Sequence, residues 1–152
     1  MRAVKLQELL VIEIQVRSPV DLGGGRRFIP FDGGSFKGYE GLEGTAGTVL
    51  EGGIDWQNVR SDGVLDIDAH YTLQSDRHEA IEVRSKGIRR ASEAVAGRIT
   101  RGDPVAPDEY YFRTHIRLAT WAPRLGWLND ILAVATGERE RDVVRIHVHE
   151  IL

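Results

Sequence analysis

Apolar and polar residues alternate along most of this chain, and glycine-rich breaks interrupt the alternation at short intervals. In residues 10–16, for example, Ile12, Ile14 and Val16 are separated by charged or amide side chains. A period of two residues is typical of a strand that buries one face. Short alternating runs punctuated by glycine turns predict an antiparallel all-β domain.

The longest alternating run covers residues 64–73. It follows the pair Asp62-Gly63, which is a strong hairpin signal between two apolar-periodic runs. One face of this strand carries only apolar or aromatic side chains, whereas the other is polar. The first face comprises Leu65, Ile67, Ala69, Tyr71 and Leu73, and the second comprises Asp66, Asp68, His70 and Thr72.

Similar patterns predict the other elements. Further strands are expected at residues 27–31, 42–50, 55–60, 80–85, 110–120, 128–136 and 143–151. We expect a loop at residues 18–25 and turns at 33–34 and 137–141, because these segments are rich in proline, glycine or charge. Residues 91–101 are the one good helix candidate, with Ser92 as its cap. About nine or ten strands with one short helix suit closure into a single antiparallel β-barrel domain over residues 1–152.

Size and composition narrow the class of protein. A chain of 152 residues fits one domain with a sizeable core. The net charge of −3 provides no strong field for nucleic acid or an acidic membrane surface. The chain has no cysteine, which excludes disulfides, thiolate nucleophiles and zinc–cysteine sites. With no signal peptide and no membrane-length apolar segment, we expect a cytoplasmic protein without nucleic-acid or membrane partners.

Polar and aromatic residues gather at strand positions in the centre of the chain, as a polar-tipped cavity requires. Asp68 and His70 are two positions apart on one strand, so both side chains point the same way. A carboxylate beside an imidazole orients the ring and raises its basicity, which suits a general acid or base. The alternative is that both residues simply face water on a solvated strand face.

The same candidate site has groups that can hold a ligand. Arg113 and Arg60 can stabilise an enolate, phenolate or carboxylate. Tyr71 can donate a proton, although its position places it on the face opposite His70. The remaining members are expected to bind substrate, the tryptophans by stacking on an aromatic ligand unless they serve as core anchors. These members are Asp55, Trp56, Trp127 and Asn129.

Two other patterns are weaker. His147 and His149 share a strand face and can share a metal, but no third ligand is placed beside them, so we expect no metal. The glycines before Arg26 and Arg27 suggest a phosphate cradle but precede no helix and lack the lysine of a P-loop. A flexible loop at the barrel rim is favoured, whose two arginines can gate an anionic ligand. The pairs Arg26-Arg27 and Arg89-Arg90 are interpreted as solvated surface.

Six segments taken together resemble the small bacterial and fungal family catalogued as domain of unknown function 3237. They are residues 27–38 (RFIPFDGGSFKG), 52–56 (GGIDW), 60–63 (RSDG), 68–73 (DAHYTL), 111–114 (YFRT) and 127–129 (WLN). The resemblance implies a single-domain antiparallel β-barrel, similar in outline to lipocalin-like and allene-oxide-cyclase-like barrels, that self-associates. It implies no settled activity. This chain departs from the family by having His70 where arginine is usual.

These observations lead to one expected function and two alternatives. The expected function is a cofactor-free barrel that binds a small apolar or aromatic molecule and isomerises, cyclises or hydrates it by acid/base catalysis. The first alternative is a non-catalytic carrier or sensor with the same pocket. The second is a structural or interaction protein whose barrel is filled. In each case we expect a homo-oligomer, a dimer or a trimer.

Overall fold

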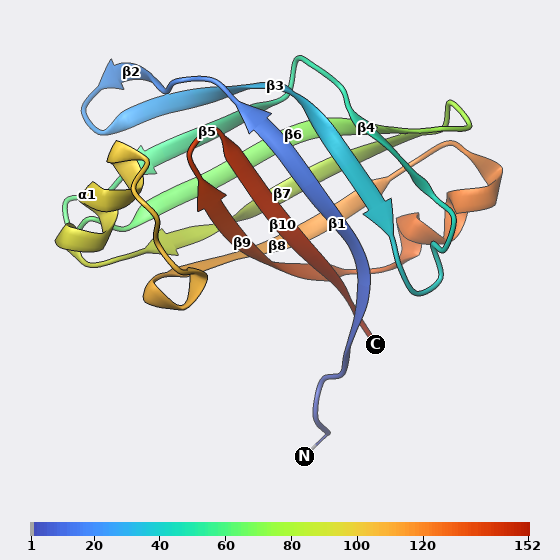
Figure 1. Cartoon of the computed structure of the whole chain (residues 1–152). Coiled ribbons are helices and arrows are strands. Elements are labelled where there is room, and N and C mark those ends of the chain that lie inside the picture. The colour runs from blue at the N-terminus through green and yellow to red at the C-terminus, as the bar shows by residue number, and fades with distance from the viewer. Residues whose placement is uncertain (1) are drawn as a thin grey trace.

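The computed structural model describes residues 2–152 as a closed antiparallel β-barrel with short helical segments at its ends (Figure 1). The strands are β1 (Leu6–Val16), β2 (Val20–Gly23), β3 (Arg26–Gly38), β4 (Ala46–Val49), β5 (Ile54–Val59), β6 (Leu65–Ser75), β7 (Ala80–Arg90), β8 (Tyr111–Ala119), β9 (Ala133–Glu140) and β10 (Val143–Ile151). The helical segments are α1 (Glu93–Arg101) and the 3₁₀ turns η1 (Pro107–Glu109) and η2 (Pro123–Asp130). The predicted single all-β barrel is therefore confirmed.

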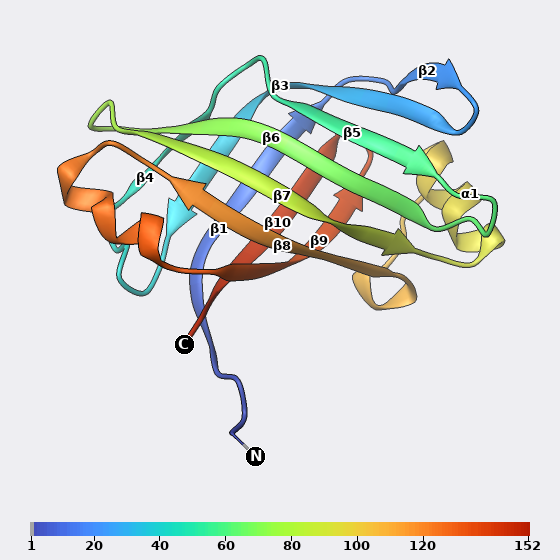
Figure 2. The same cartoon turned by 180° about the vertical axis from the view of Figure 1, so that it is seen from behind.

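The barrel has eight strand positions around its wall. Neighbouring strands follow the order β1-β10-β9-β8-β7-β6, and β4 and β5 share the next place between β6 and β3. Pairing of β1 with β3 closes the ring, and β2 lies outside it against β3 alone. Helix α1 lies at one end of the barrel and η2 at the other (Figure 2). No helix in residues 2–152 combines the length and the apolar content needed to cross a membrane.

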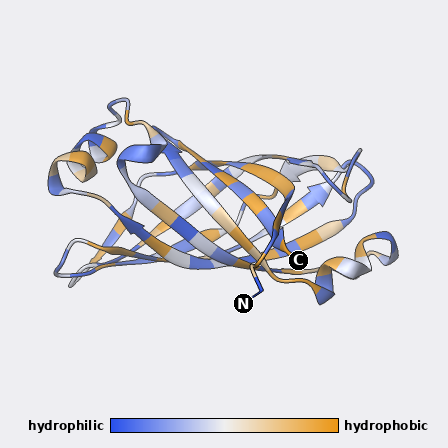
Figure 3. Ribbon diagram, turned by 90° about the horizontal axis from the view of Figure 1, so that it is seen from below, coloured by the Kyte–Doolittle hydropathy of each residue, from blue (hydrophilic) through white to orange (hydrophobic). Residues whose placement is uncertain are grey.

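Alternation along the strands separates the interior from the surface, as the colours in Figure 3 show. On β6, Leu65, Ile67, Ala69, Tyr71 and Leu73 are all buried. This is the face that the sequence predicts to be buried. Burial of a continuous apolar face from every wall strand supplies the main driving force for closure.

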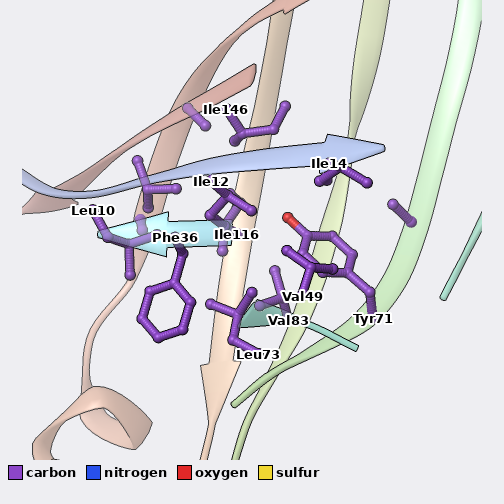
Figure 4. Close-up of a cluster of buried hydrophobic side chains, with 14 of the residues drawn as sticks. Leu10, Ile12, Ile14, Phe36, Val49, Tyr71, Leu73, Val83, Ile116 and Ile146 are labelled. Atoms are coloured by element: carbon purple, nitrogen blue, oxygen red, sulfur yellow. The ribbon is translucent and has the colours of Figure 1, made fainter. Parts of the chain in front are cut away.

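Apolar side chains fill the half of the barrel nearer to η2. Figure 4 shows this cluster, in which side chains from β1, β3, β6, β7, β8 and β10 meet around the barrel axis. Leu10, Ile12 and Leu73 are completely inaccessible to solvent there. The structure thus fills this half as a packed core.

Several predicted turns and caps are confirmed. The Asp62-Gly63 hairpin joins β5 to β6: the Arg60 N–H donates to the Val64 carbonyl at 2.9 Å, and Asp62 Oδ1 accepts from the Val64 N–H at 3.0 Å. Helix α1 begins where expected, because Ser92 Oγ accepts from the Val95 N–H at 3.2 Å. Local side-chain acceptors of this kind define where an element starts.

Five segments differ from the expectation. Residues 18–25 contain the short strand β2, and residues 33–34 continue β3 without a turn. The strand expected at 42–50 shrinks to β4 because residues 42 and 45 use their N–H groups in turns with the carbonyls of Tyr39 and Leu42. Residues 123–130 form η2, so β9 starts only at Ala133 and extends through most of the expected 137–141 turn.

Candidate functional site

Three arginines turn their side chains into the α1 end of the barrel. On β3, Arg27 lies on the same face as the buried Ile29 and Phe31. Arg89 continues the inward face of β7, and Arg139 continues the inward face of β9. All three are half-buried. Each occupies the last inward position before its strand reaches the rim. The filled core therefore gives way to a charged layer at this end.

A pocket of about 560 Å³ lies over these arginines. Its rim comes from the segment before β2, from α1 with the residues after it, and from the turn between β9 and β10. Ile29 and Ile99 add apolar surface to it. The volume falls in the range of small-molecule sites. The full lining is Arg17, Ser18, Pro19, Arg27, Ile29, Arg89, Ile99, Thr100, Arg101, Gly102, Asp103, Arg139, Arg141 and Asp142.

The charges of the three arginines are poorly compensated. Burial lowers the pKa of Arg89 to about 10, and the nearby positive charges of Arg139 and Arg27 lower it further in the same direction. Burial likewise lowers the pKa of Arg27 and of Arg139. Within residues 2–152, the terminal nitrogens of these guanidinium groups donate to no acceptor, and the Arg89 side chain makes no hydrogen bond or ion pair. The pocket therefore combines an excess of positive charge with free guanidinium donors.

A short chain of hydrogen bonds connects this layer to a buried carboxylate. Arg27 Nε donates to Gln57 Oε1 at 2.8 Å, and Gln57 Nε2 donates to Asp55 Oδ2 at 2.7 Å. The other carboxylate oxygen of Asp55 accepts from the Asp68 N–H at 3.1 Å. Burial raises the pKa of Asp55 to about 6, although these hydrogen bonds oppose the shift. Asp55 can therefore change its charge near neutral pH.

Asp55 is expected to make the protein less stable as the pH rises from 4 to 7. Its pKa in the folded state, about 6, lies above the reference value of 3.8, so folding favours the protonated form. That contribution is fully present below the lower value and is lost as the pH rises through the higher one. It amounts to roughly 3 kcal/mol for a shift of this size. In urea unfolding, the free energy of unfolding of wild type minus that of Asp55→Asn should fall as the pH rises across this range; parallel profiles would contradict the assignment.

No group of three or more His, Cys, Asp or Glu side chains in residues 2–152 is arranged to hold a metal ion. His147, one of the two histidines considered for this role, is engaged by Glu138, with 2.7 Å between His147 Nε2 and Glu138 Oε1.

Comparison with known proteins identifies the family of this barrel. The sequence profile of the family described as "Protein of unknown function (DUF3237)" matches residues 4–151. The chain belongs to the DUF3237 family. The resemblance inferred from its sequence segments is confirmed, and the family description assigns no activity.

Relatives of this DUF3237 protein support the same conclusion. A UPF0311 protein of Rhodopseudomonas palustris is 37% identical over 138 residues, which cover 90% of this chain and 88% of the relative. The crystal structure of a conserved protein of unknown function from Rhodopseudomonas palustris superposes with a TM-score of 0.93 at 33% identity, covering 100% and 99% of the two chains. An enzyme from Penicillium herquei shares the fold, with a TM-score of 0.71 at 18% identity and coverage of 100% and 97%.

The DUF3237 barrel separates the residues that the sequence predicts to share one site. Asp68 and His70 lie on the outer face of β6 and are exposed. His70 Nε2 lies 2.7 Å from Glu82 Oε1, so Glu82 and not Asp68 orients the ring, which corrects the expected pair. Asp68 instead lies 3.8 Å from Lys86 Nζ. The geometry gives His70 and Asp68 no cavity in common with the arginines, and their catalytic roles stay predictions.

The two arginines of the predicted site also lie on the surface. Arg113 is exposed on β8, where its guanidinium stacks 4.9 Å from the ring centroid of Tyr111. Arg60 pairs with Asp66 beside the hairpin, with 2.6 Å between Arg60 Nη2 and Asp66 Oδ1. Cation–π and surface ion pairs of this type are ordinary surface interactions.

The aromatic and amide members occupy three further places. Trp56 is 37% exposed on the outer face of β5, packed against Phe28 with ring centroids 5.0 Å apart. Trp127 packs against the core from η2, at the end opposite the pocket. Asn129 Oδ1 accepts from the Thr120 N–H at 2.8 Å, and Asn129 Nδ2 donates to the Thr120 carbonyl at 2.9 Å. These contacts are structural in kind.

Only Asp55 and Tyr71 of the predicted set point into the barrel. Tyr71 is 3% exposed, and its hydroxyl, which Figure 4 shows among aliphatic side chains near Ile14, has no hydrogen-bond partner in residues 2–152. Burial and then the Asp55 charge raise its pKa, so the phenol stays protonated. Its inward direction agrees with the parity derived from the sequence.

Sequence reasoning found one of the three pocket arginines and missed the others. The sequence places Arg27 at the barrel rim, which agrees with its position, but in a pair interpreted as solvated, whereas its side chain is half-buried. Arg89 was interpreted as part of a solvated pair, and Arg139 as part of a charged turn. A signal for both existed: extending the period-two pattern of residues 81–87 and 133–137 by two positions places each arginine on the inward face.

Proposed function

We propose that this protein binds a small organic anion in the arginine-lined pocket at the α1 end of its barrel. The observation that supports this most directly is that Arg27, Arg89 and Arg139 turn unpartnered guanidinium donors into one pocket. The pocket lining holds six arginines against two acidic residues, Asp103 and Asp142, and such an excess of cations in a half-buried site destabilises a fold. A bound anion would supply the missing acceptors and relieve their mutual repulsion.

The lining also indicates which class of anion fits. A planar guanidinium donates two parallel hydrogen bonds to a carboxylate or a similar oxyanion. Ile29 and Ile99 border the same pocket and offer contact to an apolar part of the ligand. An aryl or alkyl carboxylate, or an enolate or phenolate of similar size, meets both requirements. The expected apolar or aromatic ligand thus becomes an amphipathic one with a negatively charged end.

Cofactor-free acid/base catalysis is a second candidate for the same pocket. Arginines that bind a carboxylate also stabilise an enolate or phenolate that forms during isomerisation, cyclisation or hydration. Asp55 favours this candidate, because a carboxyl with a pKa of about 6 can exchange a proton near neutral pH. One observation would distinguish an enzyme from a carrier protein. The enzyme would exchange hydrogen between the ligand and solvent, whereas a carrier would not.

Titration with simple anions followed by NMR tests the binding proposal. Benzoate, benzenesulfonate and 1-naphthoate should shift the side-chain Nε–H signals of Arg89 and Arg139 with saturation, because they supply an acceptor that the pocket lacks. The neutral benzamide and 1-naphthamide are matched controls and should leave these signals in place. Equal shifts from acids and amides, or none from the acids, would refute an anion site.

A further inference from the structure

We infer that anion binding in this pocket is coupled to protonation of Asp55, with Gln57 acting as the positioning residue that transmits the proton's effect to Arg27. The inference rests on the proposed function, because it describes how the charge of that same pocket is controlled. It concerns a residue beneath the pocket lining, whose carboxylate is linked to the lining residue Arg27 by hydrogen bonds through Gln57.

The two hydrogen bonds of the Gln57 side chain run in defined directions. The Gln57 amide turns its oxygen toward Arg27 and its nitrogen toward Asp55, at 2.8 Å and 2.7 Å. This orientation suits an ionised Asp55, because a carboxylate accepts but does not donate. In this state Gln57 restrains Arg27, and part of the positive charge of Arg27 balances Asp55.

A proton on Asp55 Oδ2 turns this atom from a hydrogen-bond acceptor into a donor. The new O–H needs an acceptor, and the nearest amide supplies one once Gln57 rotates to present Oε1 to Asp55. Gln57 Nε2 then faces Arg27 Nε, so that two donors meet and the restraint on Arg27 is lost. The guanidinium becomes free to turn toward the pocket, and the balancing negative charge of Asp55 disappears at the same time. Both changes strengthen the field that an anion meets.

Charged groups on four strands act on Asp55, the arginines favouring its ionised form and Asp68 opposing it. Arg27 on β3, Arg89 on β7 and Arg139 on β9 all interact with its charge, while Asp68 on β6 repels it and the Tyr71 phenol stays neutral. A bound anion would neutralise the field of the three arginines at Asp55. Loss of that field raises the pKa of Asp55 beyond its value of about 6 in the unliganded barrel. By reciprocity, protonation of Asp55 must then tighten anion binding.

Benzenesulfonate is a suitable probe because it stays ionised throughout the pH range of interest. Its affinity for the wild-type protein, measured by NMR titration in Bis-Tris and Tris buffers, should be about fivefold or more tighter at pH 5.5 than at pH 8. Addition of the probe to unbuffered protein near pH 6.5 should raise the pH, because the complex takes up a proton. Carbon NMR of the Asp55 carboxyl should report a higher pKa in the complex.

Two variants separate coupling from general electrostatics. Asp55→Asn should bind benzenesulfonate with an affinity that changes little with pH and should take up no proton. Asp66→Asn, which removes a carboxylate from the outer face of the same barrel, should keep the wild-type pH dependence. Binding of the probe with no pH dependence and no proton uptake in wild type would overturn the coupling and leave the anion site standing. Complete failure of the probe to bind would overturn the proposed function together with it.

Discussion

Replacement of Arg89 by methionine is expected to stabilise the barrel and to weaken its binding of benzoate at least tenfold. Arg89 lies on the inward face near the end of β7, and its side chain has no hydrogen-bond or ion-pair partner in residues 2–152. Both desolvation and repulsion by Arg139 and Arg27 therefore disfavour the charged form of Arg89. Methionine keeps an unbranched apolar stem of similar length and removes the charge. A residue that lowers stability without serving packing is the signature of a functional site.

The size of the gain follows from the pKa of Arg89. A fall from 12.5 to about 10 means that the charged form is disfavoured by roughly 3 kcal/mol in the fold. The substitution also removes the attraction between Arg89 and Asp55, which offsets part of this gain. We therefore expect a net gain of about 1–3 kcal/mol in the free energy of unfolding. Urea unfolding measures the gain, and calorimetric titration with benzoate measures the loss of affinity, about 1.4 kcal/mol for each factor of ten.

Arg117→Met is the matched control. Arg117 is exposed on the outer face of β8, so its replacement removes the same charge without changing the pocket. We expect its effect on stability to stay within about 0.5 kcal/mol and benzoate affinity to stay unchanged. If Arg89→Met were destabilising, or if both variants lost benzoate equally, Arg89 would be a structural residue and the anion would bind elsewhere.

The fold follows from the sequence because one physical rule governs most of the chain. A closed barrel buries one face of each wall strand, so the period-two pattern of residues 64–73 fixes both the strand and its inward face. The rule fails where the backbone finds local hydrogen bonds instead. Residues 123–130 have apolar positions but form η2, and Asn129 secures it by bonding both polar backbone groups of Thr120. Sequence periodicity alone does not show such local competition.

The site was harder to predict, for a reason visible in His70. Histidine and aspartate are the usual candidates for catalysis. On a strand with an apolar inward face, however, such polar side chains are the ones that face water. His70 and Asp68 illustrate this, since both are exposed on β6. The arginines of the pocket lie at strand ends, where a charge after an apolar run resembles a turn. Only their parity with the buried residues behind them distinguishes Arg89 from its exposed neighbour Arg90.

Asp55 shows how far sequence reasoning reaches. It was predicted to contact a ligand because it lies in the central segment GGIDW, and the structure places it near the pocket, in the layer beneath Arg27. Its raised pKa depends on burial by strands distant in sequence and on the orientation of Gln57. Neither is encoded locally. The residue type and strand position were accessible from sequence, whereas its protonation behaviour needed the three-dimensional arrangement.

The seam that closes the barrel depends on one glycine, and Gly34→Ala is expected to cost about 3 kcal/mol or more of stability. Gly34 lies on β3 with φ +146°, and a Cβ atom there would lie 2.0 Å from the carbonyl oxygen of Glu13 on β1. The obstacle is backbone on both sides, so no side-chain rotation relieves it. The pairing of Ile14 with Gly34 would have to open, in the middle of the β1–β3 ladder.

Gly24→Ala separates this clash from the general cost of a left-handed glycine. Gly24 has φ +63° in the turn between β2 and β3, and a Cβ there meets nothing within 4 Å. We expect it to lower the free energy of unfolding by only about 1 kcal/mol in urea. Equal losses for the two variants would mean that backbone conformation, and not contact between β1 and β3, limits the seam. A much larger loss at Gly34 would show that closure requires this contact; because β3 also carries Arg27, such opening should weaken anion binding too.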